Sequence, residues 1–103
     1  MVLNSPFPVE WAPSADADLG RIRAYIAPKS PVGFQGLVRR IVAATDRLAE
    51  FPEAGVVSGR YRYIVVAPYR LYYRFDGEKV VILCCWDSRR NPAALRIVEP
   101  EAD

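Results

Sequence analysis

The chain has 103 residues, of which 51% are hydrophobic and 25% are charged, and its net charge is +2. This length suits a single hydrophobic core, so we expect residues 1–103 to form one domain, with a core at 7–95 and an acidic tail at 96–103. No apolar run is long enough to span a membrane, and the first residues lack the charged start of a signal peptide, so we expect a cytoplasmic protein with no membrane partner.

The composition also excludes several kinds of chemistry. The chain contains no histidine, which is the usual general base at neutral pH and the commonest metal ligand. Ser-His-Asp catalysis and zinc hydrolysis are therefore excluded, and we expect no metal and no cofactor. Cys84 and Cys85 are adjacent in an apolar run, so in a strand their thiols would point to opposite faces. We expect both to be free, buried side chains in a reducing compartment.

The first half of the chain is predicted to contain one strand and two helices. Alternating apolar residues predict a short strand over residues 7–11. Apolar residues then recur at three- and four-residue spacing, which predicts an amphipathic helix over 15–27 with Ser14 as its N-cap. A rigid Pro-Lys-Ser-Pro sequence at 28–31 ends that helix, and a second apolar stripe predicts another helix from Val32 to about Glu50.

The second half is predicted to be a sheet of three β-segments, at 60–66, 69–75 and 79–86. Asp76-Gly77 is a strong tight-turn signal, so the last two segments should form an antiparallel hairpin. The predicted order is β-α-α-β-β-β, an α+β fold. We expect the helical hairpin to pack on one face of this antiparallel sheet and to leave the other face open.

Positive charge is concentrated in the β-rich part of the chain. Residues 1–59 carry six basic and six acidic side chains, whereas residues 60–96 carry eight basic and three acidic ones. Three further acidic residues follow in the tail. This asymmetry favours a polyanionic or acidic partner for the sheet.

Alternate residues of a strand share a face, which sorts the segment 69–75 into two sets. The set assigned to the core is Leu71, Tyr73 and Phe75. The set assigned to the open face is Arg70, Tyr72 and Arg74, joined by Arg60 and Arg62 if the pairing of the preceding strand places them there. Guanidinium forks recognise phosphates and carboxylates, and phenol rings offer flat contact surfaces. The alternative is an ordinary solvated strand face.

The remaining aromatic and acidic residues of the sheet have structural interpretations. Tyr63 and Tyr73 are expected in the core, because aromatic residues favour strands and fill cores. Trp86 is expected to pack against other side chains, with base stacking as the alternative. Asp87 is expected to form a salt bridge with Arg89 or Arg90, with a role as general base as the alternative.

Four stretches of the chain occur in an informative order. They are Trp-Ala-Pro-Ser-Ala-Asp-Ala-Asp-Leu at 11–19, Leu-Ala-Glu-Phe-Pro-Glu-Ala-Gly at 48–55, Pro-Tyr-Arg-Leu-Tyr-Tyr at 68–73 and Asp-Ser-Arg-Arg-Asn-Pro at 87–92. Together they resemble the RelE/ParE superfamily of toxins from type II toxin-antitoxin modules, over about residues 7–95. The resemblance implies a small α/β toxin that is neutralised by a cognate antitoxin.

The resemblance includes two branches that act differently. RelE-like members cleave mRNA in the ribosomal A site with several basic residues and usually a tyrosine near the C-terminus, whereas ParE-like members block DNA gyrase. The resemblance places Arg70 and Arg90 on basic positions that RelE-like nucleases use. No tyrosine follows Pro92, however, and the early sheet lacks the lysine-rich run of those nucleases. The closing Arg-Arg-Asn-Pro looks more ParE-like, although Asp87 stands where a histidine is common.

We therefore expect a ParE-like toxin that inhibits growth by blocking DNA gyrase, and we favour a non-hydrolytic action over an enzyme. One alternative is a RelE-like endonuclease with the ribosome and mRNA as partners, and another is a non-toxic module that binds nucleic acid or protein. The expected target-binding residues are Arg60, Arg62, Arg70, Tyr72, Arg74, Arg89 and Arg90. The expected antitoxin-binding residues are Arg70, Tyr72, Arg74 and Trp86. The catalytic candidates of an RNase would be Arg62, Arg70, Asp87 and Arg90.

Overall fold

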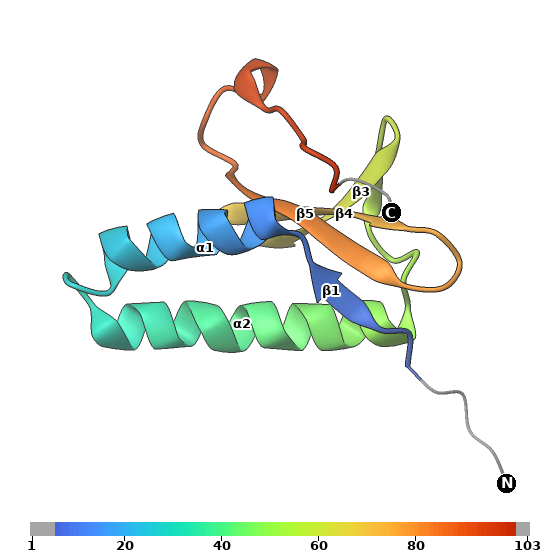
Figure 1. The fold of residues 1–103 in the computed structure, drawn as a ribbon. Coiled ribbons are helices and arrows are strands. Elements are labelled where there is room, and N and C mark those ends of the chain that lie inside the picture. Colours follow the sequence, from blue (N-terminus) through green and yellow to red (C-terminus); the bar gives the residue numbers. More distant parts are fainter. Residues whose placement is uncertain (1–5, 101–103) are drawn as a thin grey trace, which may run out of the picture.

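Two helices pack against a five-stranded sheet in the computed structural model, which describes residues 6–100 (Figure 1). The elements are β1 (Val9–Trp11), α1 (Pro13–Ile26), α2 (Pro31–Glu50), β2 (Val56–Ser58), β3 (Tyr61–Val66), β4 (Tyr69–Phe75), β5 (Val80–Asp87) and a 3₁₀ turn at Pro92–Ala94. The predicted α+β class and helical hairpin are confirmed. The N-terminal residues 1–5 and the end of the predicted acidic tail, 101–103, lie outside the described residues.

The sheet is larger than the predicted set of three strands. Its strand order is β1-β5-β4-β3-β2. Strand β1 pairs in parallel with β5, and the helical hairpin and three other strands separate the two in the chain. Strand β2, which lies outside the three predicted β-segments, pairs antiparallel with β3. The turn between β2 and β3 contains Gly59 with a φ of 59°, a left-handed conformation that favours glycine.

The predicted Asp76-Gly77 turn joins β4 and β5 as an antiparallel hairpin. Gly77 has a φ of 92°, which an L side chain would rarely adopt. The Asp76 carboxylate accepts hydrogen bonds from the backbone N–H groups of Glu78 and Lys79, at 2.9 and 3.0 Å. These two bonds lower the pKa of Asp76 below its usual value. The local turn chemistry therefore acts as the sequence indicated.

Helix α1 begins earlier than predicted. Its N-cap position is Ala12, which makes no side-chain cap, and Pro13 occupies the first turn. The prediction of Ser14 as the N-cap is therefore wrong. The Ser14 hydroxyl instead donates to the carbonyl of Leu83 at 2.8 Å, and the Asp18 carboxylate accepts from the N–H of Cys85 at 2.9 Å. Ser14 and Asp18 are four residues apart in α1, a rise of about 6 Å, and Leu83 and Cys85 are two residues apart in β5, a rise of about 6.6 Å. Because these two spacings match, side chains of α1 can hydrogen-bond to the backbone of β5 beyond the end of β1.

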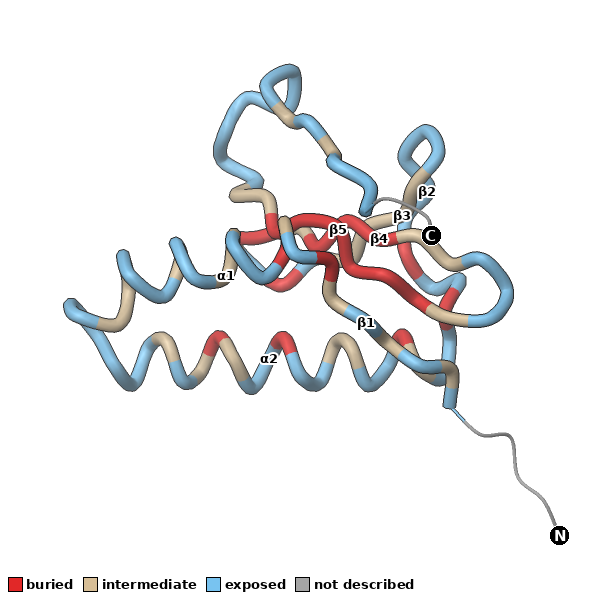
Figure 2. Tube along the Cα trace, viewed as in Figure 1, coloured by how far each residue is buried: buried red, intermediate tan, exposed pale blue. Residues whose placement is uncertain are grey.

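The main core lies between the helical hairpin and one face of the sheet. The helices contribute Ala15, Leu37, Ile41 and Leu48, and the strands contribute Val66, Tyr69, Leu71, Tyr73, Val80, Ile82 and Cys85. Most of β4 and β5 is buried, whereas the helices are buried only at intervals along one side (Figure 2). Neither helix of the described region is long and apolar enough to cross a membrane.

A second, smaller apolar cluster lies away from the main core. Its buried members are Ala12, Val81 and Leu83, and Tyr61 and Ile97 pack against them. Ile97 belongs to the C-terminal segment, which returns across the sheet (Figure 1). The face that we expected to be open is therefore partly covered by the chain's own C-terminal residues.

The pairing of β4 with β5 is irregular next to the two cysteines. Tyr72 pairs with Cys84, but the next residue, Tyr73, pairs with Ile82, so Leu83 is the extra residue of a bulge. Both cysteines are free and buried, as predicted. Burial raises the pKa of each thiol to about 12, so neither is a thiolate at neutral pH.

Candidate partner-binding surface

The face of the sheet opposite the helices is organised in rows of side chains that cross the strands. Residues directly opposite each other in an antiparallel pair share a face. One row contains Val65, Arg70 and Trp86. The neighbouring row contains Val56, Tyr63, Tyr72 and Cys84. The row that contains Arg70 and Trp86 thus lies beside the row that contains Tyr63 and Tyr72.

Two arginines lie over aromatic rings in this region. The Arg70 guanidinium carbon is 4.3 Å from the ring centre of Tyr63, and its Nη1 donates to the Tyr72 hydroxyl at 3.4 Å. The Arg90 guanidinium carbon is 4.5 Å from the ring centre of Trp86. These contacts orient both guanidinium groups before any partner arrives.

The two arginines are brought together by Trp86. Trp86 is the cross-strand partner of Arg70 and carries Arg90 over its ring. We name this set, with Tyr63 and Tyr72, the Arg70–Arg90 surface. It presents two cationic forks on a largely aromatic base, which suits carboxylates or phosphates attached to a partner with apolar groups.

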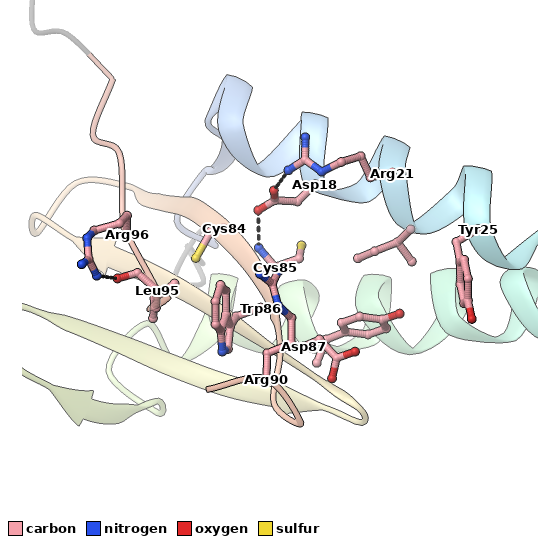
Figure 3. Close-up of a pocket in the computed structure, with 12 residues that line it drawn as sticks. Asp18, Arg21, Tyr25, Cys84, Cys85, Trp86, Asp87, Arg90, Leu95 and Arg96 are labelled. Atoms are coloured by element: carbon pink, nitrogen blue, oxygen red, sulfur yellow. Dashed lines mark hydrogen bonds and ion pairs between the residues drawn. The ribbon is translucent and has the colours of Figure 1, made fainter. Parts of the chain in front are cut away.

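A groove with a volume of about 550 Å³ adjoins the Arg70–Arg90 surface, between α1 and the end of β5. Arg21 and Tyr25 of α1 line one side, and Arg96 lines the other (Figure 3). Arg21 is paired with Asp18, the residue that also accepts from Cys85. The indole N–H of Trp86 is buried and has no hydrogen-bond partner among the described residues.

Asp87 forms the expected salt bridge. Its carboxylate accepts from Nε and Nη2 of Arg89 at 2.9 and 2.7 Å, and from the Arg89 backbone N–H at 2.9 Å. These bonds lower the pKa of Asp87 to about 2. A carboxylate with so low a pKa is a weak base, so its geometry favours the structural interpretation over general-base catalysis.

Asp87 should make the stability of the protein depend on pH in a narrow acidic window. Its pKa is lowered from 3.8 to about 2 on folding, so its contribution is complete above pH 3.8 and is lost as the pH falls toward 2. We expect the difference in free energy of unfolding between the wild type and Asp87→Asn to shrink over this window. Urea unfolding at pH 7, 5, 3 and 2 measures it, and a difference that stays constant down to pH 2 would contradict the assignment.

Arg62 lies on the opposite face of the sheet from the Arg70–Arg90 surface. It pairs with the core residue Tyr73, and its Nη1 donates to the carbonyls of Glu53 and Gly55 at 3.0 Å each. It therefore holds the junction between α2 and β2.

The two tyrosines that we expected in the main core lie on opposite faces of the sheet. The prediction for Tyr63 is wrong, because its ring lies under Arg70. The prediction for Tyr73 is confirmed, because this residue is fully buried in the main core.

Three other predicted arginines lie around the margins. Arg74 is bound by Glu99 at 2.6 Å and lies 3.8 Å from Asp76. Arg60 is exposed in the turn between β2 and β3. Arg89 is 71% exposed but is paired with Asp87. The structure thus gathers Arg70, Tyr72, Trp86 and Arg90 and separates the others from them.

Sequence patterns offered partial signals for what was missed. Tyr61, Tyr63 and Val65 occupy alternate positions, and Ile64 lies between the last two. Choosing Ile64 as the inward-facing residue would have placed Tyr63 on the face away from the core. The contact of Glu99 with Arg74 has no comparable local signal. No three His, Cys, Asp or Glu side chains in the described part of the chain are close enough to hold a metal ion.

Comparison with known proteins identifies the family. A family model described as the ParE toxin of the type II toxin-antitoxin system parDE matches residues 9–92. The chain belongs to the ParE toxin family. This ParE-family chain is therefore the toxin component of a type II toxin-antitoxin system, as the superfamily resemblance implied. Toxins of this type pair with a cognate antitoxin.

One curated protein and one solved structure are similar to this ParE-family toxin. It is 42% identical over 72 residues to Toxin RelE2 of Caulobacter vibrioides. The match covers 67% of this chain and 82% of that protein. A solved structure titled "Chromosomal ParDE TA system from P. aeruginosa" has a chain that superposes with a TM-score of 0.60. That match is 22% identical and covers 79% of this chain and 95% of the other, so it shows the shared fold.

Proposed function

We propose that this ParE-family toxin inhibits growth in the cytoplasm by binding DNA gyrase through the Arg70–Arg90 surface, without hydrolysing a substrate. The observation that carries the proposal is the pair of arginines stacked on aromatic rings. Asp87 has a pKa of about 2, and burial raises the pKa of the nearby Tyr69 hydroxyl above its usual value. Such a surface is better suited to holding an acidic or phosphate-bearing partner than to moving protons.

The antitoxin is proposed to bind an overlapping surface. Tyr72 and Trp86 offer aromatic contacts, and Arg70 can bind a carboxylate while remaining on Tyr63. Occupation of these residues would neutralise the toxin by direct competition with the target. Arg60 and Arg89, which are exposed at the margins, would extend the contact with the larger target.

Ribosome-dependent cleavage of mRNA is the second candidate. The name of the C. vibrioides relative, RelE2, favours it. Arg70 and Arg90 could stabilise the charge of a pentacoordinate phosphate, and electrostatic stabilisation can contribute much of a rate without a titrating base. The absence of histidine from the sequence therefore leaves this activity open.

The two candidates differ in a direct experiment. The purified toxin is added to a supercoiling reaction with purified DNA gyrase and, in parallel, to a translating extract with a defined mRNA. We expect loss of supercoiling with intact mRNA. Cleaved mRNA with normal supercoiling would support the second candidate, and no effect in either reaction would support a binding module without toxicity.

A further inference from the structure

The chain that follows β5 is attached to the end of the sheet at Ser88. The Ser88 backbone N–H and the Ser88 hydroxyl both donate to the carbonyl of Pro68, at 2.9 and 2.7 Å. Pro68 directly precedes β4, so these bonds continue the β4–β5 ladder one step beyond its last pair, Tyr69 with Asp87. A carbonyl oxygen has two lone pairs and can accept both bonds.

Within the part of the chain that the structure describes, the other hydrogen bonds of residues 88–96 are local. Those of Arg89 and Arg90 go to Asp87, and the later ones stay between residues 91 and 96. The two bonds from Ser88 are the ones that reach a distant part of the chain. They therefore help to set the direction in which the chain leaves β5.

The adjacent residues Arg89 and Arg90 have different surroundings in this turn. The N–H of Arg90 donates to the Asp87 carbonyl at 3.0 Å, which closes the turn. The Asp87 carboxylate accepts from the guanidinium of Arg89. The Arg90 guanidinium instead lies over Trp86, the cross-strand partner of Arg70, at the end of β5 (Figure 3). The turn thus leaves Arg90 as the second fork of the Arg70–Arg90 surface.

The stack of Arg90 on Trp86 needs support from the backbone beneath it. Arg90 is exposed, and a cation–π contact at an exposed site is weak by itself. We propose that Ser88 is a positioning residue, whose hydroxyl fixes the turn to Pro68 and thereby holds Arg90 over Trp86 for contact with the target. The contact with the target rests on the proposed function, whereas the holding of Arg90 is independent of what the target is.

The position of Arg90 can be measured by NMR without any target. An aromatic ring displaces the signals of protons held over its face, and Trp86→Leu gives the Arg90 side-chain signals without that ring. In Ser88→Ala one hydrogen bond is lost, so we expect the ratio of held to released Arg90 to fall about two- to tenfold. The Arg90 signals should move toward their positions in Trp86→Leu. Ser88→Thr keeps the hydroxyl and should keep the wild-type signals.

Two controls separate the loss of this anchor from a general change in the sheet. Ser58→Ala removes an exposed hydroxyl from β2 and should leave the Arg90 signals at their wild-type positions. In Ser88→Ala the side-chain signals of Arg70, which lies over Tyr63, should not move.

The second readout is the inhibition of gyrase supercoiling by the purified toxin. Ser88→Ala should require about two- to tenfold more toxin for half-inhibition than the wild type, and Ser88→Thr should require the wild-type amount. In an Arg90→Gln background, which keeps Arg70, Ser88→Ala should have no further effect. A residue that acts through Arg90 has nothing left to position there.

Arg90 signals that are identical in the wild type and Ser88→Ala would overturn the proposal, and so would a threonine variant that behaves like the alanine variant. An equal loss of inhibition in the wild-type and Arg90→Gln backgrounds would overturn it as well, because Ser88 would then act by another route. A wild-type toxin that leaves supercoiling intact would contradict the proposed function instead. The NMR comparison would then decide by itself whether Ser88 holds Arg90.

Discussion

Gly55→Ala is expected to lower the free energy of unfolding by about 2 to 5 kcal/mol, because it adds a side chain where none fits and disturbs buried hydrogen bonds. A Cβ at this position would lie 2.5 Å from the Tyr73 hydroxyl and 2.9 Å from the carbonyl oxygen of Tyr63. The Tyr73 hydroxyl accepts from the N–H of Gly55 at 2.9 Å and donates to the carbonyl of Pro52 at 2.8 Å. The ring is fully buried and has little room to move. Urea unfolding measures the effect.

Gly36→Ala is the matched control for this variant. A Cβ at this helical position would meet nothing within 4 Å, so alanine should raise the stability by about 0.5 to 1 kcal/mol through its higher helix propensity. Tyr73→Phe tests the hydrogen bonds alone and should cost about 1 to 3 kcal/mol, because two buried backbone groups lose their partner. If Gly55→Ala unfolds at the same urea concentration as the wild type, the inference that Gly55 packs closely against Tyr73 is wrong.

The double replacement of Arg70 and Arg90 with glutamine should abolish growth inhibition when the toxin is induced. Both guanidinium groups lie on aromatic rings and are the forks of the Arg70–Arg90 surface. Loss of two charge-assisted contacts in one interface is expected to weaken target binding by about a hundredfold or more. Growth of the induced culture and inhibition of supercoiling by the purified variant measure the effect.

The fold of this double variant should persist, because Arg90 is exposed, Arg70 is half-buried outside the main core, and arginines at such positions contribute little to stability. Its melting temperature is expected within about 3 °C of the wild type. The matched control replaces Arg23 and Arg39, two exposed arginines of the helical hairpin, and should retain full toxicity. Full toxicity of the Arg70 and Arg90 variant, or equal loss in the control, would show that net charge or another surface carries the activity.

Much of the fold was predictable from local sequence. The three- and four-residue spacing of apolar side chains located both helices, and Asp76-Gly77 located the β4–β5 hairpin, because periodicity and turn chemistry act over a few residues. The alternation along β4 likewise assigned Tyr73 to the core and Arg70 to the opposite face correctly. Of the candidate surface, Arg70, Tyr72, Trp86 and Arg90 were named from sequence and are gathered by the structure.

Apart from the N-cap of α1, the assignments that failed depend on how distant segments align. A slip of one residue in strand pairing moves every side chain to the other face, and this decided that Tyr63 and not Arg62 joins Arg70. The parallel pairing of β1 with β5 and the return of Glu99 to Arg74 join residues far apart in the chain. The sequence by itself therefore determined both helices, most of the strands and the two faces of β4. Only the tertiary structure decided register and long-range contacts, because their energies arise after the chain has folded back on itself.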